Sequence, residues 1–178
     1  MSKDLQQVFY AALRSAINKV LRMCRTEANR ALREHYRLSK ADIDKVMTMK
    51  LSSGKNFTGE LIVGGQQFKL YAFPSRQLRA GVKVTITKGM PKTLTHTFIA
   101  TMQSGHTGIF ERKGDKVAMK SGRYRGQKRQ QIKELTGPAI ADLFAGKKIV
   151  DRLEAIVKEK LPETFAHEFE YYRGRWNV

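Results

Sequence analysis

Apolar residues recur at three- and four-residue spacing from Asp4 to about Tyr36, which is the pattern of an amphipathic helix. Arginine and lysine fall mostly between them, and the run contains neither glycine nor proline. Ser39 then precedes KADIDKVM and can cap the free N–H groups of a second, short helix. Residues 1–46 are therefore predicted to be helical. The apolar stripe of the long helix consists of Leu5, Val8, Phe9, Ala12, Leu13, Ala16, Ile17, Val20, Cys24, Ala28, Ala31 and Leu32.

The apolar period changes to two at about Met47. It predicts strands in MTMKL, TGELIVG, QFKLYAF, VKVTITK and TLTHTFIATM. Gly64-Gly65 separates the second of these segments from the third and indicates a hairpin turn between them. Residues 47–111 are therefore predicted to be β-rich.

One strand shows the alternation most clearly. In VKVTITK, the apolar side chains alternate with Lys83, Thr85 and Thr87, which is typical of a sheet with one buried face. We expect that face to pack on the apolar stripe of the long N-terminal helix. The residues predicted to meet are Val82, Val84 and Ile86 on the strand and Phe9, Leu13 and Ile17 on the helix.

The segment ERKGDKVAMKSGRYRGQKRQQIK, residues 111–133, has no apolar period and carries nine Lys or Arg against Glu111 and Asp115. We expect residues 112–131 to form a flexible basic loop. IKELTGPAIADLF then predicts a short extended piece, a Gly-Pro break and the start of a helix. Residues 132–178 are predicted to hold this extended piece and the C-terminal helices.

The order of helices, strands and helices predicts an α+β fold. We expect a central antiparallel sheet flanked by a long N-terminal helix and by C-terminal helices, with the flexible basic loop projecting from it. A length of 178 residues suits one domain with a real core, so the prediction is a single domain over residues 1–178.

The charge of the chain is large and unevenly placed. The formal net charge is +18 and the isoelectric point about 10.2, which points to nucleic acid, an anionic membrane surface or an acidic partner. Residues 111–133 hold nine basic and two acidic side chains, a net charge of +7, whereas residues 134–178 hold seven and eight, a net charge of −1. The surplus therefore ends where the C-terminal section begins.

Motifs for catalysis or metal binding are not evident in the sequence. The four histidines are scattered and, with the single Cys24, show no metal-ligand spacing. The glycines around Lys55 match neither a P-loop nor a dinucleotide fingerprint. No window approaches the roughly 20 apolar residues of a membrane span. We predict a protein that is not an enzyme, with no catalytic residues, metal or cofactor, and no membrane association.

Three interpretations compete for the basic segment: a disordered basic tail, a catalytic phosphate loop, or a flexible arm that faces a polyanion. Its mixture of Lys, Arg, Gly and Ser with Tyr124 as its one aromatic residue favours sequence-independent phosphate contacts over base stacking. A solvated loop without a partner, or one docked on an acidic neighbour, stays an alternative. The predicted DNA-facing residues are Arg112, Lys113, Lys116, Lys120, Arg123, Arg125, Lys128 and Arg129.

Several motifs occur in a familiar order: HTFIATMQSGHTGIFERKG at 96–114, IKELTGPAIADLF at 132–144 and LEAIVKEKLPETFAHEFEYYRGR at 153–175. With an N-terminal AINKV helix and a basic middle, they resemble the minor tail protein Z family of lambda-like bacteriophages and prophages. The resemblance implies a structural virion protein of the tail or neck that completes the tail for head–tail joining and settles the end of the packaged DNA. It implies no enzymatic activity and no metal.

By analogy with related neck and tail-tube proteins, the resemblance also implies a homo-oligomeric ring, with six copies favoured. Expected neighbours are tail-tube, tail-terminator or head–tail connector proteins, together with phage genomic DNA bound through nonspecific phosphate contacts. The expected location is the virion, after assembly in the host cytoplasm. EFEYYRGRW near the C-terminus combines aromatics and arginines typical of interface cores. Phe169, Tyr172 and Trp176 are therefore predicted to contact another subunit or a neighbouring tail protein, and packing back on their own domain stays an alternative.

Two other function classes stay open on the residues alone. A cellular, sequence-nonspecific nucleic-acid-binding protein would carry the same basic charge but would also be expected to carry a recognisable reading motif. A hydrolytic enzyme would require a constellation of residues that the sequence does not offer.

Overall fold

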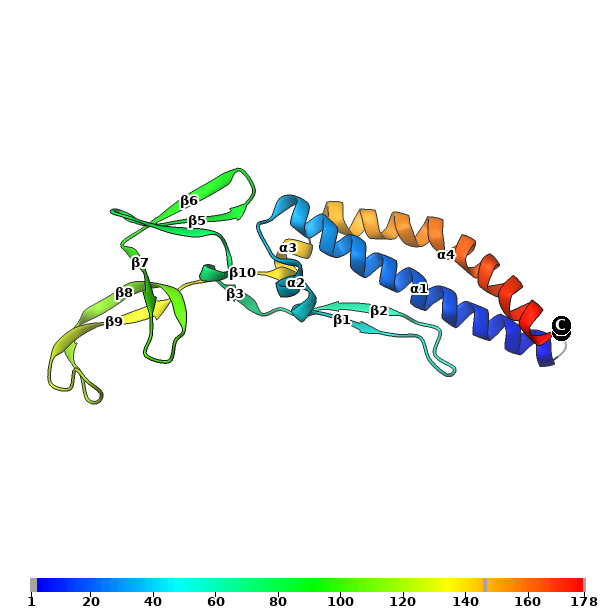
Figure 1. Cartoon of the computed structure of the whole chain (residues 1–178), viewed down its shortest axis with the longest axis horizontal. Helices are drawn as coiled ribbons and strands as arrows, with labels where there is room; N and C mark the ends of the chain where they lie inside the picture. Colours follow the sequence, from blue (N-terminus) through cyan, green and yellow to red (C-terminus); the bar gives the residue numbers. More distant parts are fainter. Residues whose placement is uncertain (1–2, 146, 178) are drawn as a thin grey trace. The chain divides into compact units, whose positions relative to one another are not determined.

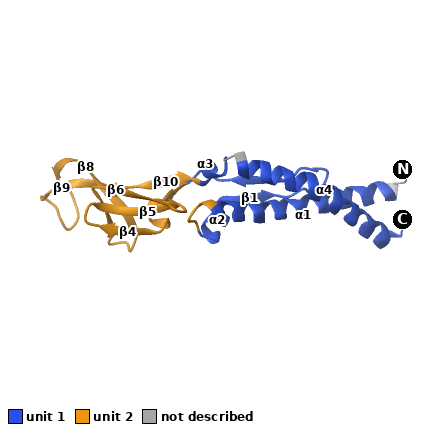
Figure 2. Cartoon of the chain, turned by 90° about the horizontal axis from the view of Figure 1, so that it is seen from above, with its two compact units in different colours: residues 1–34, 39–66, 140–178 blue, residues 35–38, 67–139 orange. Residues whose placement is uncertain are grey.

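The protein is described from a computed structural model that covers residues 3–145 and 147–177. The fold is α+β, as predicted, with a long N-terminal helix packed on a long C-terminal helix and several small antiparallel sheets. The chain divides into two compact units (Figure 2). Unit 1 comprises residues 1–34, 39–66 and 140–178, and unit 2 comprises residues 35–38 and 67–139.

Two long helices dominate unit 1: α1 (Lys3–His35) and α4 (Lys147–Trp176). They run side by side and antiparallel, because the start of α1 lies beside the end of α4 (Figure 1). The ring centroids of Phe9 and Phe165 lie 5.2 Å apart near that end, and the Arg152 guanidinium lies 2.7 Å from a Glu27 carboxylate oxygen further along. The apolar stripe of α1 thus gains its cover from a segment more than 100 residues later in the chain.

The short helix α2 (Lys40–Val46) begins where the sequence predicts it. The Ser39 side chain accepts a hydrogen bond from the backbone N–H of Asp42 at 3.1 Å, which confirms Ser39 as the N-cap. Strand β1 (Met47–Lys50) follows directly and pairs antiparallel with β2 (Glu60–Val63). A further short helix, α3 (Ile140–Phe144), also belongs to unit 1.

Unit 2 contains three small sheets and the 3₁₀ turn η1 (Leu70–Ala72). The first sheet pairs β3 (Gln67–Lys69) with β10 (Thr136–Ala139). The second consists of β4 (Ser75–Leu78), β5 (Gly81–Thr87) and β6 (Met90–Thr95). The third consists of β7 (Thr97–Thr101), β8 (Thr107–Ala118) and β9 (Lys128–Glu134). The expected single central sheet is therefore replaced by several small ones.

Two predicted strand connections are wrong. Gly64-Gly65 does not join a hairpin, because β2 pairs with β1 and β3 pairs with β10. TLTHTFIATM is not one strand, because His96 adopts a left-handed backbone with φ of 58° and separates β6 from β7. The side chain of Thr97 stabilises this break by donating to the Leu94 carbonyl at 2.7 Å. Local alternation predicts strands but does not predict their partners.

The predicted partner of β5 also differs. Val82 and Val84 are buried as expected, and Ile86 is half-buried. All three belong to unit 2, whereas Phe9 and the neighbouring apolar face of α1 belong to unit 1 and face α4. The reason is that an apolar helix stripe fits any apolar surface of matching size, so its pattern does not name its partner.

Candidate nucleic-acid interface

The basic segment forms a β-hairpin, made of β8, β9 and the turn 119–127 between them; we refer to it as the basic hairpin. Backbone pairing extends from Phe110 opposite Glu134 to Ala118 opposite Lys128. The expectation of a flexible loop over residues 112–131 is therefore wrong for most of its length. This ribbon has no apolar alternation because both of its faces are exposed, so neither face requires apolar residues.

The base of the basic hairpin is anchored in unit 2 by apolar contacts. Ile109 and Phe110 are buried, and the Phe110 ring lies 6.2 Å from that of Phe98 on β7. The Arg112 guanidinium lies over the Phe98 ring, 5.2 Å from its centroid, which is within cation–π range. From Arg112 outward to Arg129 nearly every side chain is exposed.

A bulge interrupts the pairing between Lys113 and Lys116. Gly114 has φ of +71°, a conformation that glycine adopts without strain, and its carbonyl accepts a hydrogen bond from the Gln130 side chain at 3.0 Å. Bulges of this kind bend and twist a ribbon and change the direction of its side chains.

The turn at the tip is ordered by backbone hydrogen bonds. Met119 N–H donates to the Gln127 carbonyl at 3.0 Å, and Gly126 N–H donates to the Met119 carbonyl at 2.9 Å. Gly122 and Gly126 supply the positive φ angles of +76° and +83° that the turn requires. The glycines therefore serve defined turn positions.

The basic side chains surround this ribbon. Side chains alternate between the two faces of a strand, and residues paired across a ladder share a face. Lys116 and Lys128 consequently lie on one face, while Lys113 and Arg129 lie on the other. The turn contributes a third group, Lys120, Arg123 and Arg125.

These cations are not neutralised within the chain. Among residues 3–145 and 147–177, no carboxylate oxygen lies within 4.0 Å of the charged nitrogens of the eight predicted DNA-facing residues. Unit 1 differs, since Lys19, Arg25, Arg30 and Arg152 all have carboxylate partners there. The structure thus brings the eight residues together on one exposed, positively charged element.

The acidic residue at the end of β9 has its own partners. Glu134 accepts from Lys69 Nζ at 2.7 Å and contacts His106 Nε2 at 2.8 Å. Burial alone would raise the pKa of Glu134, but the hydrogen bonds and charges of Lys69 and His106 outweigh it and hold the pKa below its usual value. Glu134 is therefore ionised and interacts with Lys69 and His106 at the base of the basic hairpin, away from its tip.

An aromatic platform lies at the tip. The Arg129 guanidinium is 3.7 Å from the centroid of the Tyr124 ring, and the Arg123 guanidinium is 5.8 Å from it. Guanidinium groups stacked on a ring keep their N–H donors directed outward in its plane, where they can reach phosphate oxygens. The sequence shows Tyr124 within a basic run, but it does not show this stacking.

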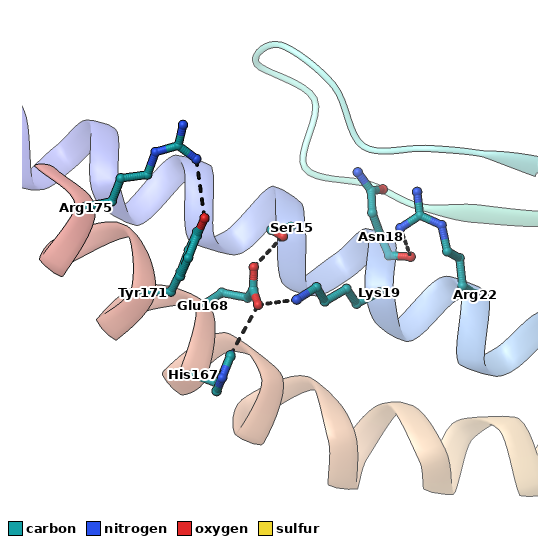
Figure 3. Close-up of polar contacts among 8 residues, drawn as sticks. All are labelled: Ser15, Asn18, Lys19, Arg22, His167, Glu168, Tyr171 and Arg175. Atoms are coloured by element: carbon teal, nitrogen blue, oxygen red, sulfur yellow. Dashed lines mark hydrogen bonds and ion pairs between the residues drawn. The ribbon is translucent and has the colours of Figure 1, made fainter.

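The most enzyme-like set of side chains lies between α1 and α4 and is made of Ser15, Lys19, His167 and Glu168 (Figure 3). We call it the Glu168 cluster. Ser15 Oγ and Lys19 Nζ each donate to the Glu168 carboxylate at 2.5 Å, and His167 Nδ1 lies 3.3 Å from it. Burial alone would raise the pKa of Glu168, but these hydrogen bonds lower it below its usual value.

This geometry does not make a catalytic triad. The Ser15 hydroxyl donates directly to the carboxylate, so it has no histidine general base to accept its proton. Glu168 itself is 3% exposed, so its carboxylate is almost entirely withdrawn from solvent. The arrangement instead joins the two long helices through a buried charge, and sequence reasoning missed it because its members are about 150 residues apart.

The predicted interface aromatics lie near the end of α4. Phe169 and Tyr172 are half-buried and Trp176 is 42% exposed. The Tyr172 ring contacts those of Tyr171 and Trp176, with centroids 5.2 and 6.2 Å apart. The cluster leaves aromatic surface exposed, so the interface role of these residues stays a prediction.

Residues 3–145 and 147–177 contain neither a metal-binding cluster nor a membrane-spanning helix. Within that part of the chain, no group of three His, Cys, Asp or Glu side chains is placed to hold a metal ion. None of the helices described there combines the length and apolar character that a bilayer crossing requires. Cys24 is buried, and burial raises the pKa of its thiol.

Comparison of the chain with protein-family models, with curated proteins and with solved structures finds no match. The resemblance to the minor tail protein Z family therefore stays a prediction.

Proposed function

We propose that the protein is a structural, sequence-nonspecific DNA-contacting component of a phage tail or neck. The single observation that supports the DNA contact is the basic hairpin, an ordered ribbon whose eight Lys and Arg side chains have no carboxylate partners among the described residues. A cation without a carboxylate partner on an exposed element has little favourable electrostatic interaction within its own chain, whereas a polyanion can supply a strong one.

The physical mechanism of the contact is counterion release. Each phosphate neutralised by Lys or Arg frees a condensed cation from DNA, so affinity falls steeply with salt and hardly depends on sequence. A two-stranded ribbon also fits the major groove of B-DNA. Because both faces and the tip of the basic hairpin are positive, such a ribbon can reach phosphates on either side of the groove without reading bases.

The placement in a tail or neck rests on the sequence resemblance. A protein beside the path of packaged DNA has to accept any sequence that passes, and phosphate contacts meet that requirement. In this proposal the protein acts as a ring subunit, six copies favoured, that completes the tail for head–tail joining. Phe169, Tyr172 and Trp176 then supply contacts to a neighbouring subunit or to a tail-tube, tail-terminator or connector protein.

The DNA contact is tested by fluorescence anisotropy with two duplexes of unrelated sequence between 50 and 200 mM salt. The hairpin variant carries five glutamine substitutions, at Lys120, Arg123, Arg125, Lys128 and Arg129. We expect similar affinities of the native protein for both duplexes. We expect the variant to lower the steepness of the log–log salt dependence by up to roughly 4.5, at about 0.9 per lost phosphate contact.

A matched control removes the same charge from the same unit. Five glutamines replace exposed basic residues of the β4–β6 region, namely Arg76, Arg79, Lys83, Lys88 and Lys92. The control should retain most of the salt dependence. If it loses as much as the hairpin variant, overall charge rather than the basic hairpin binds DNA, and the proposal is wrong.

A cellular nucleic-acid-binding protein is the second candidate, and the same hairpin supports it. Phage particles assembled with the hairpin variant separate the two. The tail or neck proposal predicts complete tails that fail at DNA placement or delivery. Failure to assemble any tail would make the hairpin a protein interface, and normal infectivity would remove the proposed role in the virion.

A further inference from the structure

A second positively charged surface lies in unit 1, in a groove formed by α1, α2 and β1. We call it the arginine groove. Its polar lining comes chiefly from Arg22, Arg25, Thr26, Asn29, Arg33 and Lys40. It shares no residue with the basic hairpin, which belongs to unit 2.

The lining follows from helical geometry. Residues advance by about 100° around a helix, so positions 22, 25, 26, 29 and 33 fall within an arc of about 100° on one face of α1. Their rise of about 1.5 Å per residue spreads the row from Arg22 to Arg33 over about 16 Å. The groove therefore offers a line of donors along α1, with Lys40 contributed by the N-terminal end of α2.

Carboxylates neutralise only part of this charge. Arg25 pairs with Asp44 at 3.5 Å, and Arg22 donates to the Asn18 carbonyl at 3.4 Å. Arg33 and Lys40 are exposed, and within residues 3–145 and 147–177 no carboxylate oxygen lies within 4.0 Å of their charged nitrogens. Asp44 is the only acidic side chain among the groove-lining residues described.

The groove also contains a buried polar side chain, Asn29. Asn29 is 4% exposed and donates through Nδ2 to Asp44 and to the Lys40 carbonyl, which fixes the direction of its amide. Its Oδ1 is buried and accepts no hydrogen bond from any described residue. Unmatched buried acceptors are rare in folded proteins. A water molecule can supply the missing donor, whereas a phosphodiester has no hydrogen to donate, so phosphate contacts in the groove come from its Arg and Lys side chains.

We propose that the arginine groove binds the phosphate backbone of nucleic acid and gives the protein a second DNA contact, separate from the basic hairpin. The inference deepens the proposed function and rests on it. Arg and Lys are the donors that the groove offers, because the Thr26 hydroxyl already donates to the Arg22 carbonyl and the Asn29 amide to Asp44 and Lys40. Arg and Lys side chains contact phosphate groups in protein–DNA complexes. Four arginines line the groove, and two of them, Arg25 and Arg30, have carboxylate partners. Arg22 and Arg33 are the guanidinium groups left to offer bidentate donors to phosphate oxygens.

The length of the row favours a strand over a free phosphate ion. A single phosphate occupies only two or three of these side chains, whereas phosphates on one strand of B-DNA recur every 3.4 Å or so along the helix axis. A row of about 16 Å can therefore face several phosphates in succession. An acidic protein segment is the alternative occupant, and the experiment below distinguishes it.

The test uses the full-length chain and the duplexes described above. The groove variant carries Arg22→Gln, Arg33→Gln and Lys40→Gln, and it is made both in the native protein and in the hairpin variant. We expect each groove variant to lower the steepness of the salt dependence by roughly 2.7 relative to its parent, from three lost contacts at about 0.9 each. Arg33→Gln alone, at an exposed position, should give roughly a third of this change.

The matched control replaces three exposed lysines of the same unit, Lys55, Lys148 and Lys158, with glutamine. Circular dichroism establishes that each variant retains its helices. An equal effect of the control and the groove variant would overturn the proposal, because binding would then follow net charge alone. An unchanged salt dependence in the groove variant would overturn it as well.

The remaining outcomes separate the two sites. If the hairpin variant binds DNA like the native protein while the groove variant loses DNA binding, the groove contact is supported and the proposed hairpin contact is wrong. If only the hairpin variant loses binding, the groove inference fails and the proposed hairpin function stands. Binding of polyglutamate that the groove variant abolishes, with DNA binding unchanged, would assign the groove to an acidic protein and overturn the inference.

Discussion

Replacing Lys19 with methionine should destabilise the protein more than replacing Glu168 with glutamine, although both changes break the same ion pair. The asymmetry follows from burial, because the Glu168 side chain is 4% exposed and that of Lys19 is 48% exposed. When Glu168 is replaced by glutamine, the Lys19 side chain can rotate toward solvent, where water hydrates its ammonium group. When Lys19 becomes methionine, the carboxylate stays buried without its cation.

The magnitudes follow from the contacts in the Glu168 cluster. Hydrogen bonds to a charged group contribute about 1.5–3 kcal/mol each, and glutamine at position 168 can still accept one of the two short bonds. We therefore expect Glu168→Gln to lower the free energy of unfolding by about 1.5–3 kcal/mol. Leaving a buried charge unpaired costs about 3–5 kcal/mol, which is the expectation for Lys19→Met at neutral pH.

The pH dependence gives an independent check on the same cluster. The folded-state pKa of Glu168 lies below its usual value, so its contribution to stability is present above the unfolded-chain pKa of about 4.3 and is lost as pH falls through the folded value. The native protein should therefore unfold with a higher free energy than Glu168→Gln at neutral pH, and this difference should disappear on acidification. The deficit of Lys19→Met should shrink over the same interval, because protonation removes the unpaired charge.

Urea unfolding, followed by circular dichroism and by the fluorescence of Trp176, measures these differences. Glu170→Gln is the matched control, since Glu170 sits two positions further along α4 with an exposed side chain paired to Arg173 at 3.4 Å. That change should alter the free energy of unfolding by less than about 0.5 kcal/mol. Equal losses for Lys19→Met and Glu168→Gln, or a difference that stays constant from neutral to acidic pH, would refute the role assigned to the buried carboxylate.

Two further predictions concern the backbone of β5 and the end of α4. Gly81→Ala should destabilise unit 2 severely, because Gly81 has φ of +151° and an added Cβ would lie 1.9 Å from the Leu94 carbonyl oxygen. At Gly89 an added Cβ meets nothing within 4 Å, so Gly89→Ala should lower the free energy of unfolding by only about 1 kcal/mol. Similar melting temperatures for the two variants would contradict this prediction. Truncation directly after Glu170 keeps Glu168 and removes the exposed aromatic end of α4. The shortened chain should stay folded but no longer self-associate, as measured by light scattering. An unfolded product would show that these aromatic residues stabilise the fold instead.

The parts of the fold that could be predicted from the sequence are those whose signal lies in neighbouring residues. The helical period of residues 4–36, the Ser39 cap and the α+β class all follow from neighbouring residues and are present in the structure. The eight basic residues of the candidate interface were also found from the sequence, because charge density does not require a knowledge of tertiary contacts.

The errors occurred where the answer depends on distant residues. Alternation in the strands predicted neither the pairing of β3 with β10 nor the break at His96. The basic hairpin was predicted as a loop because apolar alternation marks a strand only when one face is buried, and here both faces carry charge or polar groups. Backbone hydrogen bonds, which every sequence can make, form this ribbon without an apolar signature.

The sequence by itself determined the α+β class, the long N-terminal helix and the position of the positive charge, because each depends on spacing or composition along a continuous stretch. Only the tertiary structure decided that α1 packs on α4, that a buried Glu168 joins them, and that arginines of α1 meet Lys40 in one groove. The physical reason is that an apolar or charged face specifies what kind of surface it needs, whereas the partner is chosen by the free energy of packing the whole chain at once.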